Sequence, residues 1–250
     1  MSRSWDAASY DVVSAVMDGM AGETLDRLDL DGDEVVLDAG CGTGRITARL
    51  LERLPRGHVI AADADPDMVR KARENLPPEV EVIQADLQEL DLDGAVDAVF
   101  STATFHWVPD HDRLFARLFA ALRPGGRLVA QCGGEGNIAR LKGAAAEVAA
   151  EPGWDGAFDG FEPSWRYAAA KETAQRLEQA GFVDVRCWLQ PYPVEPAEPV
   201  EYLRTIPLGP WIDRLPEERR GEFAQRVAER LGTPLVADYV RLNIEATRPA

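Results

Sequence analysis

The chain has 250 residues, 46% of them hydrophobic, and carries 27 Lys and Arg against 43 Asp and Glu, for a formal net charge of −16. This length and apolar content suit one compact domain with an added subdomain, whereas the acidic balance argues against nucleic acids and anionic membranes as partners, because both attract basic surfaces. The three cysteines are too widely spaced to indicate a disulfide framework or a metal site. The N-terminus is followed by no apolar core of a signal peptide, and no apolar run is long enough to span a bilayer, so we expect a cytoplasmic protein.

From Glu34 onward, short apolar runs alternate with amphipathic stretches. The apolar runs predict strands at residues 35–37, 59–61, 80–83, 96–101 and 127–130. One helix is expected around Ile46, Leu50 and Leu54, which share one helical face. A second helix is expected to begin after Pro66, and a third to cover residues 113–122. Because strands and helices alternate, we predict an α/β fold, a Rossmann-like doubly wound and mostly parallel sheet with helices on both faces.

After residue 133 the pattern changes, and residues 134–165 are rich in Gly, Ala, Trp and Phe. A helix is predicted at 171–180 and a strand at 183–189, after which prolines at 191, 193, 196 and 199 interrupt the sheet pattern. Helices at 198–206 and 217–231 and a strand at 239–246 follow. We therefore expect an N-terminal helical lid at 1–30, a sheet core at 31–133, a cap segment with the remaining core helix and strand at 134–190, a helical cap insertion at 191–235, and a C-terminal strand of the core sheet at 236–250.

The strongest chemical signal lies between the first predicted strand and helix, where residues 38–44 read Asp-Ala-Gly-Cys-Gly-Thr-Gly. Glycines allow sharp turns and close approach of a ligand, and a helix N-terminus presents unpaired N–H groups. A turn needed only for packing is the alternative. Nicotinamide-binding loops place their third glycine one residue later. We predict cofactor contacts from Asp38, Gly40, Cys41, Gly42 and Gly44.

Two carboxylates follow the next two strands. Asp63, at the end of the second, is placed to accept both hydroxyls of a ribose, and Asp86, after the third, is placed to accept from an adenine amino group. The alternatives are a charge at a helix N-terminus for Asp63 and a turn residue for Asp86. Neighbouring positions expected at the same site are Ala64, Met68, Ala85 and Leu87.

As an ordered set, residues 36–44, 62–68, 85–86 and 122–126 resemble the class I S-adenosylmethionine (SAM)-dependent methyltransferases. The similarity extends to the trans-aconitate methyltransferase-like branch through Trp5 and Tyr10, residues 101–111 and residues 239–242. The resemblance implies SAM as cofactor, S-adenosylhomocysteine as product, no metal, and a seven-stranded sheet with an antiparallel C-terminal edge strand and a helical cap. It also implies cofactor contacts from Ser101 and Trp107.

For the methyl acceptor, His106 is the candidate general base, because it follows the fourth strand on the side that would face the methyl group. The aromatic residues of the presumed cap predict either an aromatic acceptor site or simple core filling. They are Trp5, Tyr10, Trp154, Phe158, Trp165 and Trp211. Gly209 stands where the resembled branch carries an Arg, so we expect a small apolar or aromatic acceptor, not a tricarboxylate, unless Arg204 or Arg214 compensates.

The function expected from the sequence is SAM-dependent methylation of a small-molecule acceptor, with O-methylation favoured. Carboxylate methyl esterification, a nicotinamide-dependent oxidoreductase and a non-catalytic SAM-binding interaction module remain as alternatives. The only partner expected is the small-molecule substrate, with no nucleic acid and no membrane, and the chain is expected to be a monomer or weak dimer.

Overall fold

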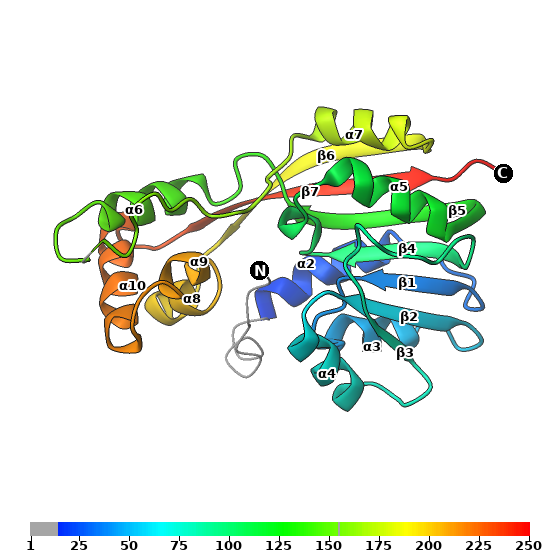
Figure 1. Cartoon of the computed structure of the whole chain (residues 1–250), viewed down its shortest axis with the longest axis horizontal. Helices are drawn as coiled ribbons and strands as arrows, with labels where there is room; N and C mark the ends of the chain where they lie inside the picture. Colours follow the sequence, from blue (N-terminus) through cyan, green and yellow to red (C-terminus); the bar gives the residue numbers. More distant parts are fainter. Residues whose placement is uncertain (1–14, 155) are drawn as a thin grey trace.

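A computed structural model describes residues 15–154 and 156–250. A twisted sheet with helices on both faces forms the larger part, and a lobe of helices lies beside it at the left of Figure 1. Two long strands of the C-terminal half, β6 and β7, run from the sheet into this lobe (Figure 1). The α/β doubly wound fold with a helical cap is therefore confirmed.

The sheet has seven strands in the order β3-β2-β1-β4-β5-β7-β6. Strands β1 to β5 pair in parallel, and β7 is antiparallel to both β5 and β6. The C-terminal strand is antiparallel as expected, but it lies between β5 and β6 and not at the edge. The strands are β1 Val35–Ala39, β2 His58–Asp63, β3 Glu81–Gln84, β4 Val96–Thr102, β5 Leu122–Gly133, β6 Val183–Val194 and β7 Ala237–Thr247.

Two layers of helices cover the sheet because strand residues alternate between its faces. On β1, Val36 packs with the helices of one face, whereas Leu37 and Ala39 pack with those of the other. The first layer consists of α2 Ala15–Asp26, α3 Arg45–Leu51 and α4 Pro66–Asn75. The second consists of α5 His111–Ala121 and α7 Ala170–Gln179.

The edge strand β6 continues through two of the prolines that were expected to interrupt the sheet. Pro191 and Pro193 pair in register with Val240 and Asp238 of β7. Proline lacks a backbone N–H, so it is tolerated where one side of a strand has no neighbour, as on this edge. The expected start of the cap insertion at residue 191 therefore falls inside β6, which ends at Val194.

The lobe at the end of β6 and β7 has its own hydrophobic core. Trp154, Tyr202, Trp211 and Phe223 are buried there together. Its helices are α6 Ala139–Ala149, α8 Pro199–Thr205, α9 Gly209–Ile212 and α10 Glu217–Leu231. The sequence predicted α8 and α10 closely, but α6 was missed because its Ala- and Gly-rich stretch has a weak amphipathic pattern.

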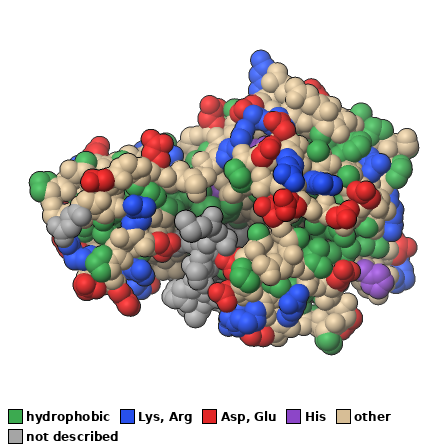
Figure 2. Space-filling view, viewed as in Figure 1, with side chains coloured by type: hydrophobic (Ala, Val, Ile, Leu, Met, Phe, Trp, Pro, Cys, Tyr) green, Lys and Arg blue, Asp and Glu red, His purple; other side chains and the backbone are tan. Residues whose placement is uncertain are grey.

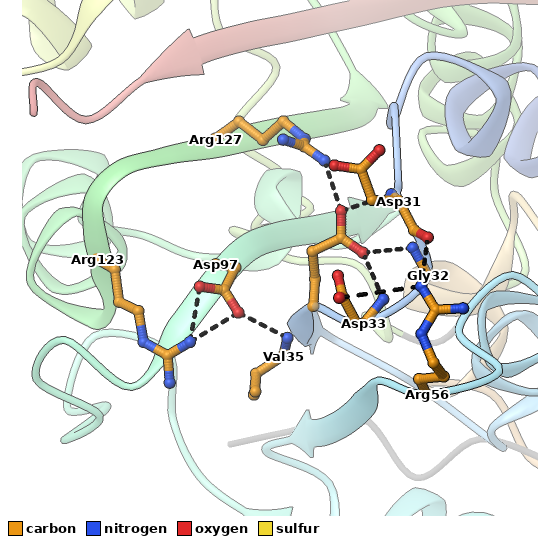
Figure 3. A network of polar contacts seen from close by, with 9 residues as sticks. Asp31, Gly32, Asp33, Val35, Arg56, Asp97, Arg123 and Arg127 are labelled. Atoms are coloured by element: carbon orange, nitrogen blue, oxygen red, sulfur yellow. Dashed lines mark hydrogen bonds and ion pairs between the residues drawn. The ribbon is translucent and has the colours of Figure 1, made fainter.

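A polar network lies at the end of the sheet where β1 and β4 begin (Figure 3). The Glu34 carboxylate accepts hydrogen bonds from the backbone N–H groups of Asp31 and Gly32 and from Arg127 of β5. Asp97 of β4 accepts from the Val35 N–H at 2.8 Å and from the Arg123 guanidinium. These contacts tie the start of β1 to β4 and β5.

Charged side chains are dispersed over the face shown in Figure 2, where Lys and Arg lie among Asp and Glu. Within residues 15–154 and 156–250, no helix is both long and apolar enough to cross a bilayer. The same residues contain no cluster of His, Cys, Asp or Glu suited to a metal ion.

Candidate active site

The candidate site lies at the carboxyl ends of the parallel strands. The strand order reverses between β1 and β4, and such a switch point opens a crevice where doubly wound sheets bind ligands. A cavity of about 90 Å³ lies there. Its lining residues are Met20, Ala21, Asp38, Gly40, Cys41, Gly42, Thr43, Arg45, Ile46, Thr102, Ala103, Gln131 and Arg241. Ligand pockets commonly measure about 300–1,000 Å³, so only part of a nucleoside cofactor would be enclosed.

The three glycines of the loop after β1 have different tasks. All have positive φ angles, of 87° at Gly40, 55° at Gly42 and 83° at Gly44. A Cβ on Gly40 would lie 2.1 Å from Thr104 Oγ1, and one on Gly44 would lie 2.8 Å from Leu76, so these two glycines serve packing. A Cβ on Gly42 would meet nothing within 4 Å, which leaves this part of the loop open to a ligand.

Asp63 holds the open part of the loop. One carboxylate oxygen accepts from the Gly42 N–H and the other from the Asp65 N–H, both at 2.9 Å. Burial raises the Asp63 pKa, although both hydrogen bonds act in the opposite direction. Asp38 is 2% exposed, accepts from Thr47 Oγ1 at 2.6 Å, and has its pKa raised to about 6 by burial.

Several predicted cofactor contacts also have tasks in the fold. Ser101 is 1% exposed and its hydroxyl donates to the Ala39 carbonyl at 2.6 Å, which ties β4 to β1. Leu87 lies in the core beneath the sheet, and Met68 is buried in the first turn of α4. Asp86 is exposed and accepts from the Gln88 N–H at 2.9 Å, so it forms the turn after β3 while remaining accessible.

Ala103 has a strained backbone beside the cavity. Its φ angle is 55°, in the left-handed region that costs a non-glycine residue about 1–2 kcal/mol. Its N–H donates to the Gln131 carbonyl at 2.8 Å, which holds this conformation at the end of β4. Strain of this kind concentrates at functional sites.

Comparison with known proteins decides the family. A methyltransferase domain model matches residues 36–126. A trans-aconitate 2-methyltransferase of Deinococcus radiodurans is 33% identical over 225 residues, covering 86% of each chain. The chain belongs to the class I SAM-dependent methyltransferases, in the trans-aconitate methyltransferase-like branch.

Solved structures share the methyltransferase fold. A putative methyltransferase from Bacillus halodurans has a TM-score of 0.62 at 19% identity, covering 93% of this chain and 100% of that one. Phosphoethanolamine N-methyltransferase 2 of Haemonchus contortus, in complex with S-adenosyl-L-methionine, has a TM-score of 0.61 at 15% identity and covers 93% of this chain and 53% of that one. The cofactor of this methyltransferase is SAM, and the open loop at Gly42 is compatible with it.

His106 of the methyltransferase has a hydrogen bond that fixes its tautomer. It is buried in the short 3₁₀ helix Phe105–Trp107, and its Nδ1 accepts from the Gly133 N–H at 3.2 Å. A neutral ring whose Nδ1 accepts carries its proton on Nε2, so Nε2 is a donor. Burial, with the nearby charge of Arg241, lowers the His106 pKa to about 3. Both features argue against the predicted role as a general base.

The sequence analysis gave no role to Gln131 and Arg241, which line the cavity from β5 and β7. Arg241 is 2% exposed and its Nε donates to Gln131 Oε1 at 3.4 Å. Arg241 also pairs in register with Gly133, which brings it beside His106. A signal was present, because an Arg and an Asn lie among apolar residues in the middle of β7, and a buried charge is uncommon without a function.

The predicted acceptor residues lie in different places. Trp165 stacks on Tyr167 with ring centroids 5.6 Å apart, and it also contacts Trp107 and Trp211. Tyr167 in turn contacts His106, so a path of aromatic rings leads from the site into the cap. The remaining cap aromatics described by the structure, Trp154 and Phe158, pack around Phe223 in the cap core.

Neither predicted compensating arginine lines the cavity. Arg204 is exposed and forms an ion pair with Glu201, and Arg214 is exposed and donates to the Ala157 carbonyl. Gly209 begins α9 and is buried. Trp5 and Tyr10 lie outside the described residues.

Proposed function

We propose that this methyltransferase transfers the SAM methyl group to a carboxylate oxygen of a small organic acid with an apolar or aromatic body. The observation that carries the proposal is Arg241, a buried cation in the wall of the cavity beside the glycine loop. The relatives named trans-aconitate 2-methyltransferases act on a substrate that carries carboxylates, which supports the same acceptor chemistry here.

The Arg241 guanidinium is 2% exposed, and in a poorly hydrated site its positive charge attracts an anionic ligand more strongly than it would in water. Burial lowers the pKa of His106 and raises that of Cys132, and the charge of Arg241 acts to lower both, so its positive potential reaches these groups. A planar guanidinium matches a carboxylate through two parallel hydrogen bonds.

The proposed chemistry needs no proton transfer. When bound, SAM supplies an activated methyl group on a sulfonium. A carboxylate oxygen forms a bond to the methyl carbon while the carbon–sulfur bond breaks, so the negative and positive charges neutralise each other. The protein's part is to align the two reactants, and such alignment contributes up to about 7–11 kcal/mol. His106 Nε2–H then acts as a hydrogen-bond donor toward the acceptor, not as a base.

The cofactor half of the site rests on the open loop. We assign the loop contact to Gly42 and the ribose hydroxyls to Asp63, whose carboxylate oxygens have lone pairs beyond the two bonds they accept. We assign the adenine amino group to Asp86, which is exposed in the turn after β3. Trp107 contacts His106 and the cap residue Trp165, and we assign it to the side of the cofactor that faces the cap.

The body of the acid is assigned to the aromatic residues at the entrance to the cap. Trp165 and Tyr167 are half-buried and stacked, with an interplanar angle of 19°. Among residues 15–154 and 156–250, the arginines in the cavity lining are Arg45 and Arg241, and this small number favours an acid with fewer carboxylates than trans-aconitate.

An acceptor screen that measures S-adenosylhomocysteine release tests the proposal. Aromatic and aliphatic carboxylic acids should react, and the corresponding phenols and amines should not. Arg241→Gln should raise the acid KM about 10- to 100-fold, as expected for a lost charge-assisted hydrogen bond. The control Arg204→Gln removes an exposed arginine outside the cavity and should change nothing. Turnover of phenols but not acids would overturn the acceptor class.

A further inference from the structure

A chain of buried polar side chains crosses the sheet from Arg241 to α2. Gln131 of β5 and Asn243 of β7 are register partners, each exposed by 1% or less. Arg241 Nε donates to Gln131 Oε1, and Gln131 Nε2 donates to Asn243 Oδ1 at 2.9 Å. Arg27, the residue directly after α2, ends the chain, because its Nη2 donates to the same Asn243 oxygen at 2.8 Å.

The direction of each hydrogen bond follows from the arginine at the α2 end. A guanidinium only donates, so Asn243 has to turn its oxygen toward Arg27. That oxygen also receives Gln131 Nε2, which leaves the Gln131 oxygen on the side of Arg241. A flip of either amide would place two donors face to face, at a cost of an unsatisfied buried group.

Gln190 of β6 satisfies the other end of the Asn243 amide. Asn243 Nδ2 donates to Gln190 Oε1 at 3.2 Å, so Asn243 is bonded on both strands that flank β7. Hydrogen bonds on both sides of the Asn243 amide favour a single arrangement of this side chain and of Gln131. Because a guanidinium is planar, the hydrogen bond from Arg241 Nε to the fixed Gln131 oxygen limits the orientations of the Arg241 guanidinium plane.

We propose that Gln131 is a positioning residue that orients Arg241 for the acceptor, and that Arg27 and Asn243 set the orientation of Gln131. This inference rests on the proposed function, in which Arg241 binds the acceptor carboxylate. It links α2, which also lines the cavity through Met20 and Ala21, to the acceptor half of the site. Acceptor binding then depends on the orientation that Gln131 gives to the Arg241 guanidinium, as well as on Arg241 itself.

A matched pair of variants separates positioning from packing. Gln131→Met and Gln190→Met each remove one glutamine that bonds Asn243, but only Gln131 bonds Arg241. Gln131→Met should raise the acid KM about tenfold, with kcat and the SAM dissociation constant changed by less than about twofold. Gln190→Met should change all three by less than about twofold. Equal KM increases in both variants would overturn the proposal.

A double-mutant cycle with Arg241→Gln tests whether Gln131 acts through Arg241. In the Arg241→Gln background, Gln131→Met should have no further effect on the acid KM, whereas independent roles give additive effects and overturn the positioning role. An unchanged acid KM in Arg241→Gln alone would instead refute the proposed function. If Gln131→Met does not fold, Gln131→Glu replaces it. Its added carboxylate competes for Arg241 and should raise the acid KM by more than tenfold, and an unchanged KM refutes the proposal.

Discussion

The replacement Asp63→Asn tests the part of the site that the sequence predicted most directly. Asp63 accepts from the Gly42 N–H and the Asp65 N–H, each at 2.9 Å and each on a different carboxylate oxygen. Asparagine keeps the shape but supplies one oxygen, so one of these N–H groups faces an NH₂ group. The loop should lose about 1–3 kcal/mol of stability, the cost of an unsatisfied buried donor.

SAM binding should weaken by more than the loop alone explains. If Asp63 also accepts the ribose hydroxyls, losing the charge costs about 1.5–3 kcal/mol, or about one to two decades in the SAM dissociation constant. Calorimetric titration with SAM measures this, and circular dichroism verifies the fold. Asp67→Asn is the control, because Asp67 is exposed in the first turn of α4 and its ion pair is with Arg70. An unchanged SAM affinity in a folded Asp63→Asn protein would refute the ribose assignment.

Three further outcomes follow from the described contacts. Gly42→Val should abolish SAM binding, measured by calorimetry, with modest loss of stability, whereas Gly40→Ala should mainly lower the melting temperature because its Cβ meets Thr104. Because burial lowers the His106 pKa to about 3, this ring should cause no inflection in the pH profile of kcat/KM between about pH 5 and 8. The donor role would be contradicted if kcat/KM fell toward acid pH within this range and if His106→Gln removed that fall. For Glu34, burial raises the pKa but hydrogen bonds from the backbone and Arg127 lower it to about 2, below its unfolded value, so its stabilisation is present at neutral pH and lost as the pH falls toward 2. Thermal melts of Glu34→Gln should therefore differ most from the parent protein at neutral pH, and an equal difference at low pH would contradict this assignment.

The sequence predicted the parallel core because its signals are local. The alternation of apolar runs and amphipathic stretches placed β1 to β5 and their helices, with ends shifted by a few residues. The loop at residues 38–44 is specified by glycines that need positive φ angles, which no other residue adopts as easily. The position of Asp63 at the end of β2 follows from the same local pattern, and the family resemblance is confirmed by the relatives.

Only the tertiary structure decided how the C-terminal half contributes to the site. The insertion of β7 between β5 and β6 is a long-range pairing that no local pattern encodes, and it tolerates Pro191 and Pro193 because β6 is an edge strand. The same insertion brings Arg241 and Asn243 next to Gln131, more than a hundred residues earlier in the chain. The sequence offered Arg204 as a residue that could bind the acceptor, but in the structure it forms an ion pair with Glu201 away from the cavity. Which arginines line the cavity depends on how distant elements pack together, and in this fold Arg241 of β7 is one of them.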